Sequence, residues 1–282
     1  MSAAGRWTQP VAARLPRIPV VSRPALAAAQ RAYSLLLQAR YRRTGMPWQV
    51  HDDTIRIDPR RRHFVPHASE ESLYRFIQRE VVPGAVVLDV GSFLGIYAIL
   101  EARRAGPAGR VVALEPTASS AAIARRHFSY NSGPCAPITL IEAAAGERRG
   151  GATFYEYEQP YVNALAAAVD VADAPVPRAV NVVSLDDVCQ ELRVTPTFIR
   201  MDVQGAEFHA LRGAREVIRA AGARLTIVAE MHPQCWPGFD IDASYAHDTI
   251  ASLGLEATPL EPGAGLFARD GHVVFRPVGV HA

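Results

Sequence analysis

Four residues in the first half of the chain have the types and spacing that could bind a small ligand. The apolar run 86–90 contains Asp89 and is followed by Gly91 and Gly95, after which helical spacing begins. Twenty residues beyond Gly95, a second apolar run ends at Glu115. A buried strand that leads through a glycine turn into a helix begins many ligand sites in doubly wound α/β domains, and a carboxylate after the second strand can accept hydrogen bonds from ribose hydroxyls. The spacing therefore predicts a ligand that carries a ribose.

The glycine spacing and Asp89 distinguish between the possible ligands. A dinucleotide site uses Gly-x-Gly-x-x-Gly, which lets a pyrophosphate reach a helix N-terminus, whereas Gly91 and Gly95 form Gly-x-x-x-Gly. Asp89 would repel a phosphate but would suit an ammonium group. S-adenosylmethionine (SAM) has a ribose, an ammonium group and a sulfonium, and it has no phosphate. The residues therefore favour SAM over NAD.

A second group of polar residues follows two later strands of the predicted sheet. Asp202 and Gly205 come after one predicted strand, and Glu230 and His232 end the next one. The carboxyl ends of parallel strands line the ligand crevice of an open α/β sheet, so these side chains are expected to converge beside the SAM methyl group. A single carboxylate at such a place could instead cap a helix or pair with an arginine, but two at neighbouring strand ends favour chemistry.

Two kinds of chemistry fit this second group. Asp202 and Glu230 could bind a hard divalent cation such as Mg²⁺, which would orient and acidify a substrate hydroxyl. Alternatively, His232 is a general base that Asp202 or Glu230 orients.

The composition excludes several classes of protein. The net charge of +2 is too small to argue for nucleic acid binding. All 30 basic residues are arginine, so no lysine can form a Schiff base, a phosphate-binding P-loop or a Tyr-x-x-x-Lys pair. The 3 cysteines are widely spaced, which predicts no disulfide framework or zinc site and favours the reducing cytoplasm. No apolar run is long enough to span a membrane.

Strand and helix patterns alternate along most of the chain, which predicts an open α/β sheet with helices on both faces. An Asp-Gly turn at 270–271 predicts a C-terminal antiparallel hairpin, and residues 158–180 are expected to form an irregular loop over the site. The expected strands are 85–90, 111–114, 138–142, 197–201 and 225–230, and the expected helices are 70–80, 96–105, 119–130, 184–192, 206–221 and 244–253.

The N-terminal part differs from the rest. Residues 1–51 contain eight arginines and no acidic residue, which is interpreted as a bacterial extension rather than an organellar transit peptide. Residues 25–43 are expected to form an amphipathic helix that covers the substrate, contacts a second subunit or packs on the core, and residues 54–66 a strand or hairpin. We therefore divide the chain into an extension, 1–69, and a SAM-binding domain, 70–282.

The motifs together resemble the FkbM-type family of SAM-dependent methyltransferases. Its Asp-Val-Gln-Gly-Ala-Glu stretch, 202–207, is the most specific match. The chain departs from the family pattern at Gln204, where a glutamate is usual, and at Ser92-Phe93, where Ala-Asn is usual. The matching segments are 87–91 with Gly95, 113–116, 184–188, 198–207, 211–214 and 229–232.

The resemblance implies a Rossmann-like class I methyltransferase fold, SAM as the methyl donor, and transfer to a hydroxyl of a natural product or sugar. It implies that Glu115 binds the ribose and that Glu142 and Ala143 flank the adenine. The expected catalytic residues are Asp202, Glu230 and His232, the expected metal ligands are Asp202 and Glu230, and the expected cofactor-binding residues are Asp89, Gly91, Ser92, Gly95, Glu115, Glu142 and Ala143.

The sequence therefore predicts a SAM-dependent O-methyltransferase that acts on a small molecule, without nucleic acid or membrane, and that forms a homo-oligomer if the N-terminal helix mediates one. A non-catalytic SAM-fold subunit that binds a partner through the arginine-rich N-terminus is the main alternative. A nicotinamide-dependent oxidoreductase is less favoured, because of the glycine spacing and the absence of lysine.

Overall fold

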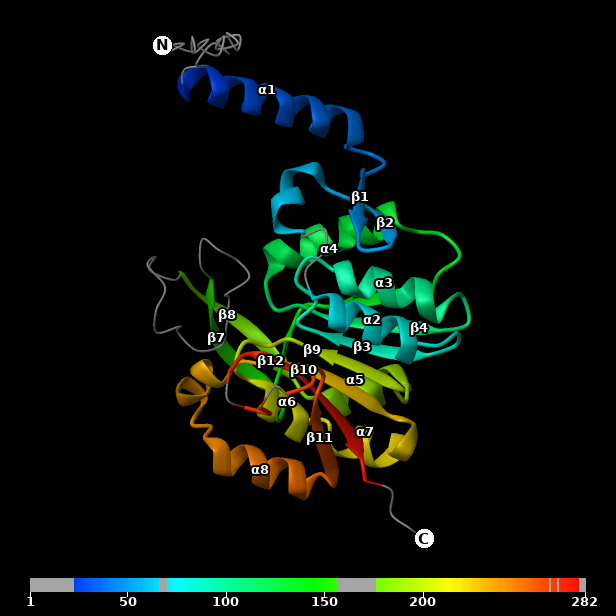
Figure 1. Cartoon of the computed structure of the whole chain (residues 1–282), viewed down its shortest axis with the longest axis vertical. Helices are drawn as coiled ribbons and strands as arrows, with labels where there is room; N and C mark the ends of the chain where they lie inside the picture. The colour runs from blue at the N-terminus through cyan, green and yellow to red at the C-terminus, as the bar shows by residue number, and fades with distance from the viewer. Residues whose placement is uncertain (1–22, 66–69, 157–175, 264, 268, 279–282) are drawn as a thin grey trace, which may run out of the picture.

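A seven-stranded sheet forms the centre of the molecule (Figure 1). The computed structural model describes residues 23–65, 70–156, 176–263, 265–267 and 269–278. The sheet consists of β3 (Val86–Val90), β4 (Arg110–Leu114), β5 (Ile138–Ile141), β9 (Phe198–Met201), β10 (Thr226–Met231), β11 (Leu255–Pro259) and β12 (Gly271–Pro277). Their order is β11-β12-β10-β9-β3-β4-β5. The five strands expected from the apolar runs are confirmed to within one residue at each end.

The strand order determines where a ligand can bind. β3, β4, β5, β9 and β10 are parallel. From β3 the chain adds β4 and β5 on one side, and it then returns to add β9 and β10 on the other. In open α/β sheets, ligands bind outside the carboxyl ends of the strands at such a reversal. Asp89 in β3 and Asp202 after β9 lie on the two sides of this point.

Helices cover both faces of the sheet (Figure 1). Because successive side chains of a strand point to opposite faces, Val87 packs with α2 and α3, and Leu88 packs with α5 to α8. One face carries α2 (Glu71–Glu80), α3 (Ile96–Ala105) and α4 (Ala118–Tyr130), and the other carries α5 (Leu185–Leu192), α6 (Glu207–Arg212), α7 (Arg215–Ala221) and α8 (Ala243–Ser252).

One expected helix, 206–221, is wrong, because it is divided into α6 and α7 at Gly213. A Cβ atom on Gly213 would lie 2.1 Å from the carbonyl oxygen of Gly146, so the two backbones pass in close contact here. The carbonyl of Gly213 also accepts a hydrogen bond of 2.8 Å from the N–H of Asp186. Contacts between segments distant in the sequence therefore interrupt a pattern that is helical by itself.

The C-terminal hairpin is confirmed, but its turn is not at Asp270-Gly271. Gly271 begins β12, and the first strand of the hairpin is β11, which is separated from β12 by the eleven residues 260–270. Apolar residues after β11 pack on α6 and do not form a strand: the ring of Phe267 lies 5.7 Å from that of Phe208 and 5.4 Å from that of Trp236. β12 pairs with β10 on its other side, so it lies inside the sheet.

A small second sheet was not expected. It contains β6 (Ala144–Ala145), β7 (Gly150–Glu156) and β8 (Val176–Val183) in the order β6-β8-β7. Residues 176–180, expected to be irregular, pair with β7. The rest of the expected loop over the site, 158–175, lies outside the described residues.

Before the main domain, the chain forms α1 (Arg23–Tyr41), a hairpin of β1 (Met46–Val50) and β2 (Asp53–Ile57), and the 3₁₀ helix η1 (Pro59–Phe64). The helix expected at 25–43 is confirmed. Of the strand or hairpin expected at 54–66, only the strand at its start is confirmed, as β2, because its partner β1 precedes the expected range and residues 59–64 form η1. Ile55 and Ile57 of β2 are fully buried in one apolar cluster with residues of α3 and α4. The division of the chain at residue 69 remains a prediction.

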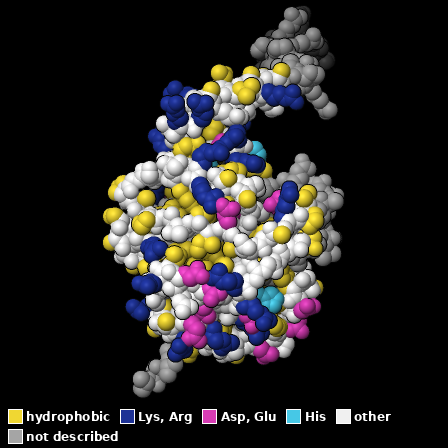
Figure 2. All heavy atoms as spheres, turned by 180° about the vertical axis from the view of Figure 1, so that it is seen from behind, with side chains coloured by type: hydrophobic (Ala, Val, Ile, Leu, Met, Phe, Trp, Pro, Cys, Tyr) yellow, Lys and Arg dark blue, Asp and Glu magenta, His cyan; other side chains and the backbone are white. Residues whose placement is uncertain are grey.

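Helix α1 extends away from the sheet (Figure 1) and is largely exposed. Arginine and apolar side chains cover it together (Figure 2). Leu26, Tyr33, Leu35 and Leu36 have exposed fractions of 50–69%. Within the described residues, no helix combines the length and the apolar composition needed to cross a bilayer.

Candidate active site at the strand ends

The turn after β3 requires glycine for two reasons. Gly91 has a φ of 80°, and a Cβ atom on it would lie 1.8 Å from the carbonyl oxygen of Asp202. Glycine therefore allows the end of β3 to approach the end of β9 directly. Gly95 precedes α3 with a φ of 75°, and its Cβ would meet the ring of Phe128 at 2.4 Å. The hydroxyl of Ser92 in this turn is buried and has no hydrogen-bond partner among the described residues.

Glu115 connects the end of β4 to the glycine turn. Its Oε2 atom accepts a hydrogen bond of 2.8 Å from the N–H of Phe93, and its Oε1 atom accepts bonds from the N–H and the hydroxyl of Thr117. Burial raises the pKa of Glu115 to about 7, although these hydrogen bonds act to lower it. The carboxylate thus lies at the carboxyl end of β4, and its contact with a ribose remains a prediction.

Asp89 is fully buried and paired with Arg200, a residue whose role the sequence pattern did not indicate. Nη1 of Arg200 lies 3.0 Å from Oδ1 of Asp89, and Nη2 lies 3.2 Å from Oδ2 of Asp202. The guanidinium carbon also lies 4.4 Å from the centre of the Tyr97 ring. Arg200 thus crosslinks β3 and the end of β9, so the expected contact between Asp89 and an ammonium group remains a prediction. One signal in the sequence could have indicated this pairing: Arg200 stands two residues before Asp202, so the two side chains point to the same face of the sheet.

Glu101 on α3 is a second buried carboxyl group beside Asp89. Neither of its oxygens has a hydrogen-bond partner among the described residues. Burial, followed by the charge of Asp89, raises the pKa of Glu101 well above its ordinary value. The folded protein therefore retains the proton of Glu101 at a pH where the unfolded chain has released it.

Replacing Glu101 with Gln should stabilise the protein, and increasingly so as the pH rises. Because the folded pKa is the higher one, the wild type loses stability as the pH rises from about 4.5 toward that pKa, whereas glutamine does not titrate. Each unit of pKa difference corresponds to about 1.4 kcal/mol. Urea unfolding of both proteins at pH 4.5, 6 and 8 measures the gain, and a gain that did not grow with pH would contradict it.

Glu142 and Ala143 follow β5, at the far side of β4 from the second polar group. Glu142 forms an ion pair with Arg125 of α4, and Ala143 is buried. Their expected place beside an adenine ring remains a prediction.

The second polar group converges on His232, which follows β10. Nε2 of His232 lies 3.9 Å from Oδ1 of Asp202 and 3.8 Å from Oε1 of Glu230. The side-chain nitrogen of Gln204 lies 2.9 Å from Nε2 and donates a hydrogen bond of 2.9 Å to Asp202. The structure thus brings together the three expected catalytic residues, and Gln204 links two of them.

The carboxylate within hydrogen-bond distance of His232 is that of Glu207, and not that of Asp202 or Glu230 as expected. Nδ1 of His232 lies 2.8 Å from Oε1 of Glu207, whereas both other carboxylates face Nε2 at distances beyond a hydrogen bond. Glu207 begins α6, in the sequence Gly-Ala-Glu. Sequence reasoning missed it because the turn that directs this side chain back toward the end of β10 is formed by tertiary contacts.

The charges around Nε2 change two pKa values. Burial lowers the pKa of His232, but the hydrogen bond and charge of Glu207, with the charges of Asp202 and Glu230, outweigh this effect and raise it to about 9. Burial and the charge of Asp202 raise the pKa of Glu230 to about 7, against the lowering effect of His232. Glu230 can therefore exchange its proton near neutral pH and His232 at moderately alkaline pH.

A divalent cation fits this donor set poorly. One ligand atom from each of Asp202, Glu230 and His232 lies within 4.8 Å of the others. However, Arg200 and Gln204 already donate hydrogen bonds to the two oxygens of Asp202. A cation there would displace these donors and lie beside the guanidinium of Arg200, which repels it.

Further polar residues, which no sequence pattern indicated, lie close to Glu230: one ligand atom from each of Glu70, Glu230 and His272 lies within 4.8 Å of the others. The hydroxyl of Tyr97 donates a hydrogen bond of 2.7 Å to Glu70, and Nε2 of His272 lies 3.3 Å from the other oxygen of Glu70. Burial raises the pKa of Glu70, but His272, Arg200 and Tyr97 outweigh this effect and lower it to about 2. The segment before α2, α3 and β12 supply these side chains, so only the fold brings them together.

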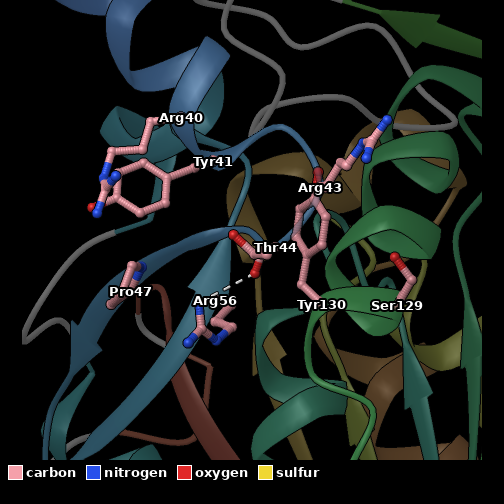
Figure 3. Close-up of a pocket in the computed structure, with 8 residues that line it drawn as sticks. All are labelled: Arg40, Tyr41, Arg43, Thr44, Pro47, Arg56, Ser129 and Tyr130. Carbon is pink, nitrogen blue, oxygen red and sulfur yellow. Dashed lines mark hydrogen bonds between the residues drawn. The ribbon is translucent and has the colours of Figure 1, made fainter.

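A separate basic pocket of about 640 Å³ lies between α1, the β1–β2 hairpin and the C-terminal end of α4 (Figure 3). Because α4 runs from the carboxyl end of β4 back toward the start of β5, this pocket lies at the opposite edge of the sheet from His232. It is therefore not part of the site at the strand ends. Its lining residues are Arg40, Tyr41, Arg43, Thr44, Pro47, Arg56, Ser129 and Tyr130.

Comparison with known protein families agrees with this arrangement. The family model described as the methyltransferase FkbM domain matches residues 89–253, which is more than half of the 282 residues. The chain belongs to the FkbM methyltransferase family. It is therefore a SAM-dependent methyltransferase, with SAM as the methyl donor. The match includes Asp89, Glu115, Asp202, Glu207 and His232.

Solved structures similar to this FkbM methyltransferase are remote in sequence, and the family assignment does not depend on them. The precorrin-6y C5,15-methyltransferase from Geobacter metallireducens has 12% identity over 74% of this chain and 88% of its own, with a TM-score of 0.42. An rRNA methylase from Streptococcus thermophilus has 8% identity over 73% of this chain and 94% of its own, with a TM-score of 0.45. The O-methyltransferase from Bacillus cereus in complex with SAH has 14% identity over 93% of this chain and 94% of its own, with a TM-score of 0.43. A separate comparison of the sequence with curated proteins found no match.

Proposed function

We propose that this FkbM methyltransferase transfers the methyl group of SAM to a hydroxyl of a small molecule, a natural product or a sugar. The observation that carries the proposal is the position of His232 Nε2 between Asp202 and Glu230, outside the carboxyl ends of β9 and β10. A neutral amine can attack a methyl group and lose its proton afterwards. A hydroxyl is a weak nucleophile unless a base removes its proton during the attack, so a fixed imidazole favours an oxygen acceptor.

In the proposed reaction, Nε2 of the neutral His232 ring takes the proton of the acceptor hydroxyl. Because the pKa of His232 is raised to about 9, the neutral fraction of the ring, and with it the rate, rises with pH up to about that value. When bound, SAM supplies an electrophilic methyl group: as the acceptor oxygen bonds to the methyl carbon, the electron pair of the C–S bond returns to sulfur and S-adenosylhomocysteine (SAH) leaves. Asp202 and Glu230 hold the acceptor beside Nε2 and stabilise the imidazolium that forms. Alignment can contribute roughly 7–11 kcal/mol to lowering the barrier, and general base catalysis a further factor of about 10²–10⁴.

The further polar residues close to Glu230 support a polar acceptor. Glu70, Tyr97 and His272 offer carboxylate, hydroxyl and imidazole groups within a few ångströms of one another. Such groups suit the several hydroxyls of a sugar or a glycosylated natural product. Glu70 and His272 also lie outside the matched residues 89–253, as expected for residues that select the acceptor of this particular enzyme. Helix α1 of the extension extends away from the sheet (Figure 1) and exposes apolar side chains, so the proposal includes the extension 1–69 as a contact with a second subunit.

Calorimetric titration with SAH tests the cofactor site. We expect micromolar binding of SAH and no binding of NAD, and we expect Glu115→Ala to weaken SAH at least tenfold, because the buried carboxylate lies at the predicted ribose position. Glu216→Ala, an exposed residue of α7, is the control and should leave the affinity unchanged. Equal affinities of the Glu115 variant and the wild type would argue against the ribose contact, and binding of NAD alone would overturn the proposal.

A further inference from the structure

The carboxylate of Glu207 is completely buried and receives three N–H donors. Oε1 accepts a hydrogen bond of 2.8 Å from the N–H of Gly205 and lies 2.8 Å from Nδ1 of His232. Oε2 accepts a hydrogen bond of 3.1 Å from Nε1 of Trp236. Hydrogen bonds from this many donors fix the orientation of the buried carboxylate.

The backbone two residues before Glu207 is packed closely against the segment that follows His232. Gly205 has a φ of 106°, and a Cβ atom on it would lie 2.6 Å from Cβ of Cys235 and 2.6 Å from the ring of Phe239. The turn after β9 is therefore pressed against the 3₁₀ helix η4 (Pro233–Phe239), which begins directly after His232. Two segments from neighbouring strand ends thus hold the carboxylate and the imidazole against each other.

This contact determines which nitrogen of His232 faces the acceptor. With the Nδ1 proton directed at Glu207, the neutral ring carries its lone pair on Nε2. The Gln204 amide nitrogen that donates to Asp202 also lies 2.9 Å from Nε2, so Nε2 is the acceptor in that contact as well. Both neighbours of the ring therefore favour the same tautomer, the one that can take a proton at Nε2.

We propose that Glu207 is the positioning residue of the methyl transfer, which holds His232 in the tautomer and orientation that receive the acceptor's proton. This inference rests on the proposed function for the identity of that proton. During the transfer the proton of the acceptor hydroxyl moves to Nε2, the Nδ1 proton stays between His232 and Glu207, and the ionised carboxylate stabilises the imidazolium. Glu207 itself takes up no proton and touches neither SAM nor the acceptor.

Nitrogen-15 NMR of the histidine rings tests the proposal in the full-length protein. Spectra with SAH present at about pH 10, where the ring is neutral because its pKa is raised to about 9, report which nitrogen carries the proton. His232→Asn assigns the signal. We expect the Nδ1–H tautomer in the wild type, and wild-type His232 protonated at Nε2 would overturn the proposal without any need for a Glu207 variant to fold.

The matched variants separate positioning from packing. Glu207→Gln should give a mixture of tautomers, because an amide can donate to Nδ1 as well as accept from it, and should lower kcat by as much as about 10⁴-fold with SAH affinity retained. Trp236→Phe removes one donor from Glu207 but leaves the carboxylate, so the tautomer should not change. A Glu207→Gln protein of lowered thermal stability whose His232 kept the wild-type tautomer would show a structural role only and would refute the proposal.

The failure of this inference can be distinguished from failure of the proposed function. The tautomer is measured without an acceptor, whereas the proposed function is measured by methyl transfer from labelled SAM to methyl glycosides and hydroxylated aromatic compounds. An N-methylated or C-methylated product with the Nδ1–H tautomer intact would overturn the proposed O-methylation and leave the contact between Glu207 and His232 established.

Discussion

Replacing His232 with Asn should lower kcat for methyl transfer about 10²–10⁴-fold, with less than a twofold change in SAH affinity. The asparagine amide can still donate a hydrogen bond to Glu207 in place of Nδ1, so the local packing is largely preserved. It has no counterpart of Nε2, the only ring nitrogen that faces Asp202 and Glu230. Turnover of labelled SAM with an acceptor and calorimetry with SAH give the two quantities.

His209 offers a matched control on α6. Its ring is half-buried, whereas that of His232 is buried, and it is likewise hydrogen-bonded, with Nε2 at 3.1 Å from the carbonyl oxygen of Phe239 and Nδ1 at 3.3 Å from the hydroxyl of Tyr245. His209→Asn therefore disturbs packing of a similar kind, but away from the strand ends, and kcat should remain within about twofold of the wild type. Equal losses in the two variants would mean that His232 acts through stability and not through proton transfer.

Replacing Gly91 with Ala should both destabilise the protein and abolish SAH binding. A Cβ atom at this position would lie 1.8 Å from the carbonyl oxygen of Asp202, and the φ of 80° is unfavourable for alanine. The backbone conformation costs about 1–2 kcal/mol and overpacking typically about 1–3 kcal/mol, so the free energy of unfolding should fall by roughly 2–5 kcal/mol. Urea unfolding and SAH calorimetry measure the two effects.

Gly84 separates the two causes. It has a similar φ of 84°, but no atom lies within 4 Å of a Cβ built on it. Gly84→Ala should therefore show only the backbone cost of about 1–2 kcal/mol and bind SAH normally. If Gly91→Ala lost no more stability than Gly84→Ala and still bound SAH, the close approach of β3 and β9 would not be the reason for glycine at this turn.

Most of the sheet could be predicted from the sequence, because its signals are local. A buried parallel strand is an apolar run of a few residues, so the runs that contain Val87 and Val112 indicate β3 and β4 without reference to any partner. The carboxylates and glycines that come after those runs in the sequence are thereby placed at the strand ends. Because the carboxyl ends of parallel strands lie at one edge of a sheet, the sequence also predicted that Asp202, Glu230 and His232 would lie close together.

The tertiary structure alone determined the chemistry of the individual side chains. Glu207 approaches His232 through a turn held by contacts with Cys235 and Phe239, and Gly213 ends α6 because the backbone of Gly146 passes beside it. Such contacts join segments that are far apart in the chain, so they produce no periodic pattern of apolar residues in the sequence.

The sequence by itself therefore determined the order of the main strands and helices, the edge of the sheet at which the candidate site lies and the residues placed there. Only the tertiary structure decided that Arg200 neutralises Asp89 and that Glu207 orients His232. Strand and helix signals depend on neighbouring residues along the chain, whereas the partner of a buried charge depends on which side chains the packed strands and turns bring within hydrogen-bond distance.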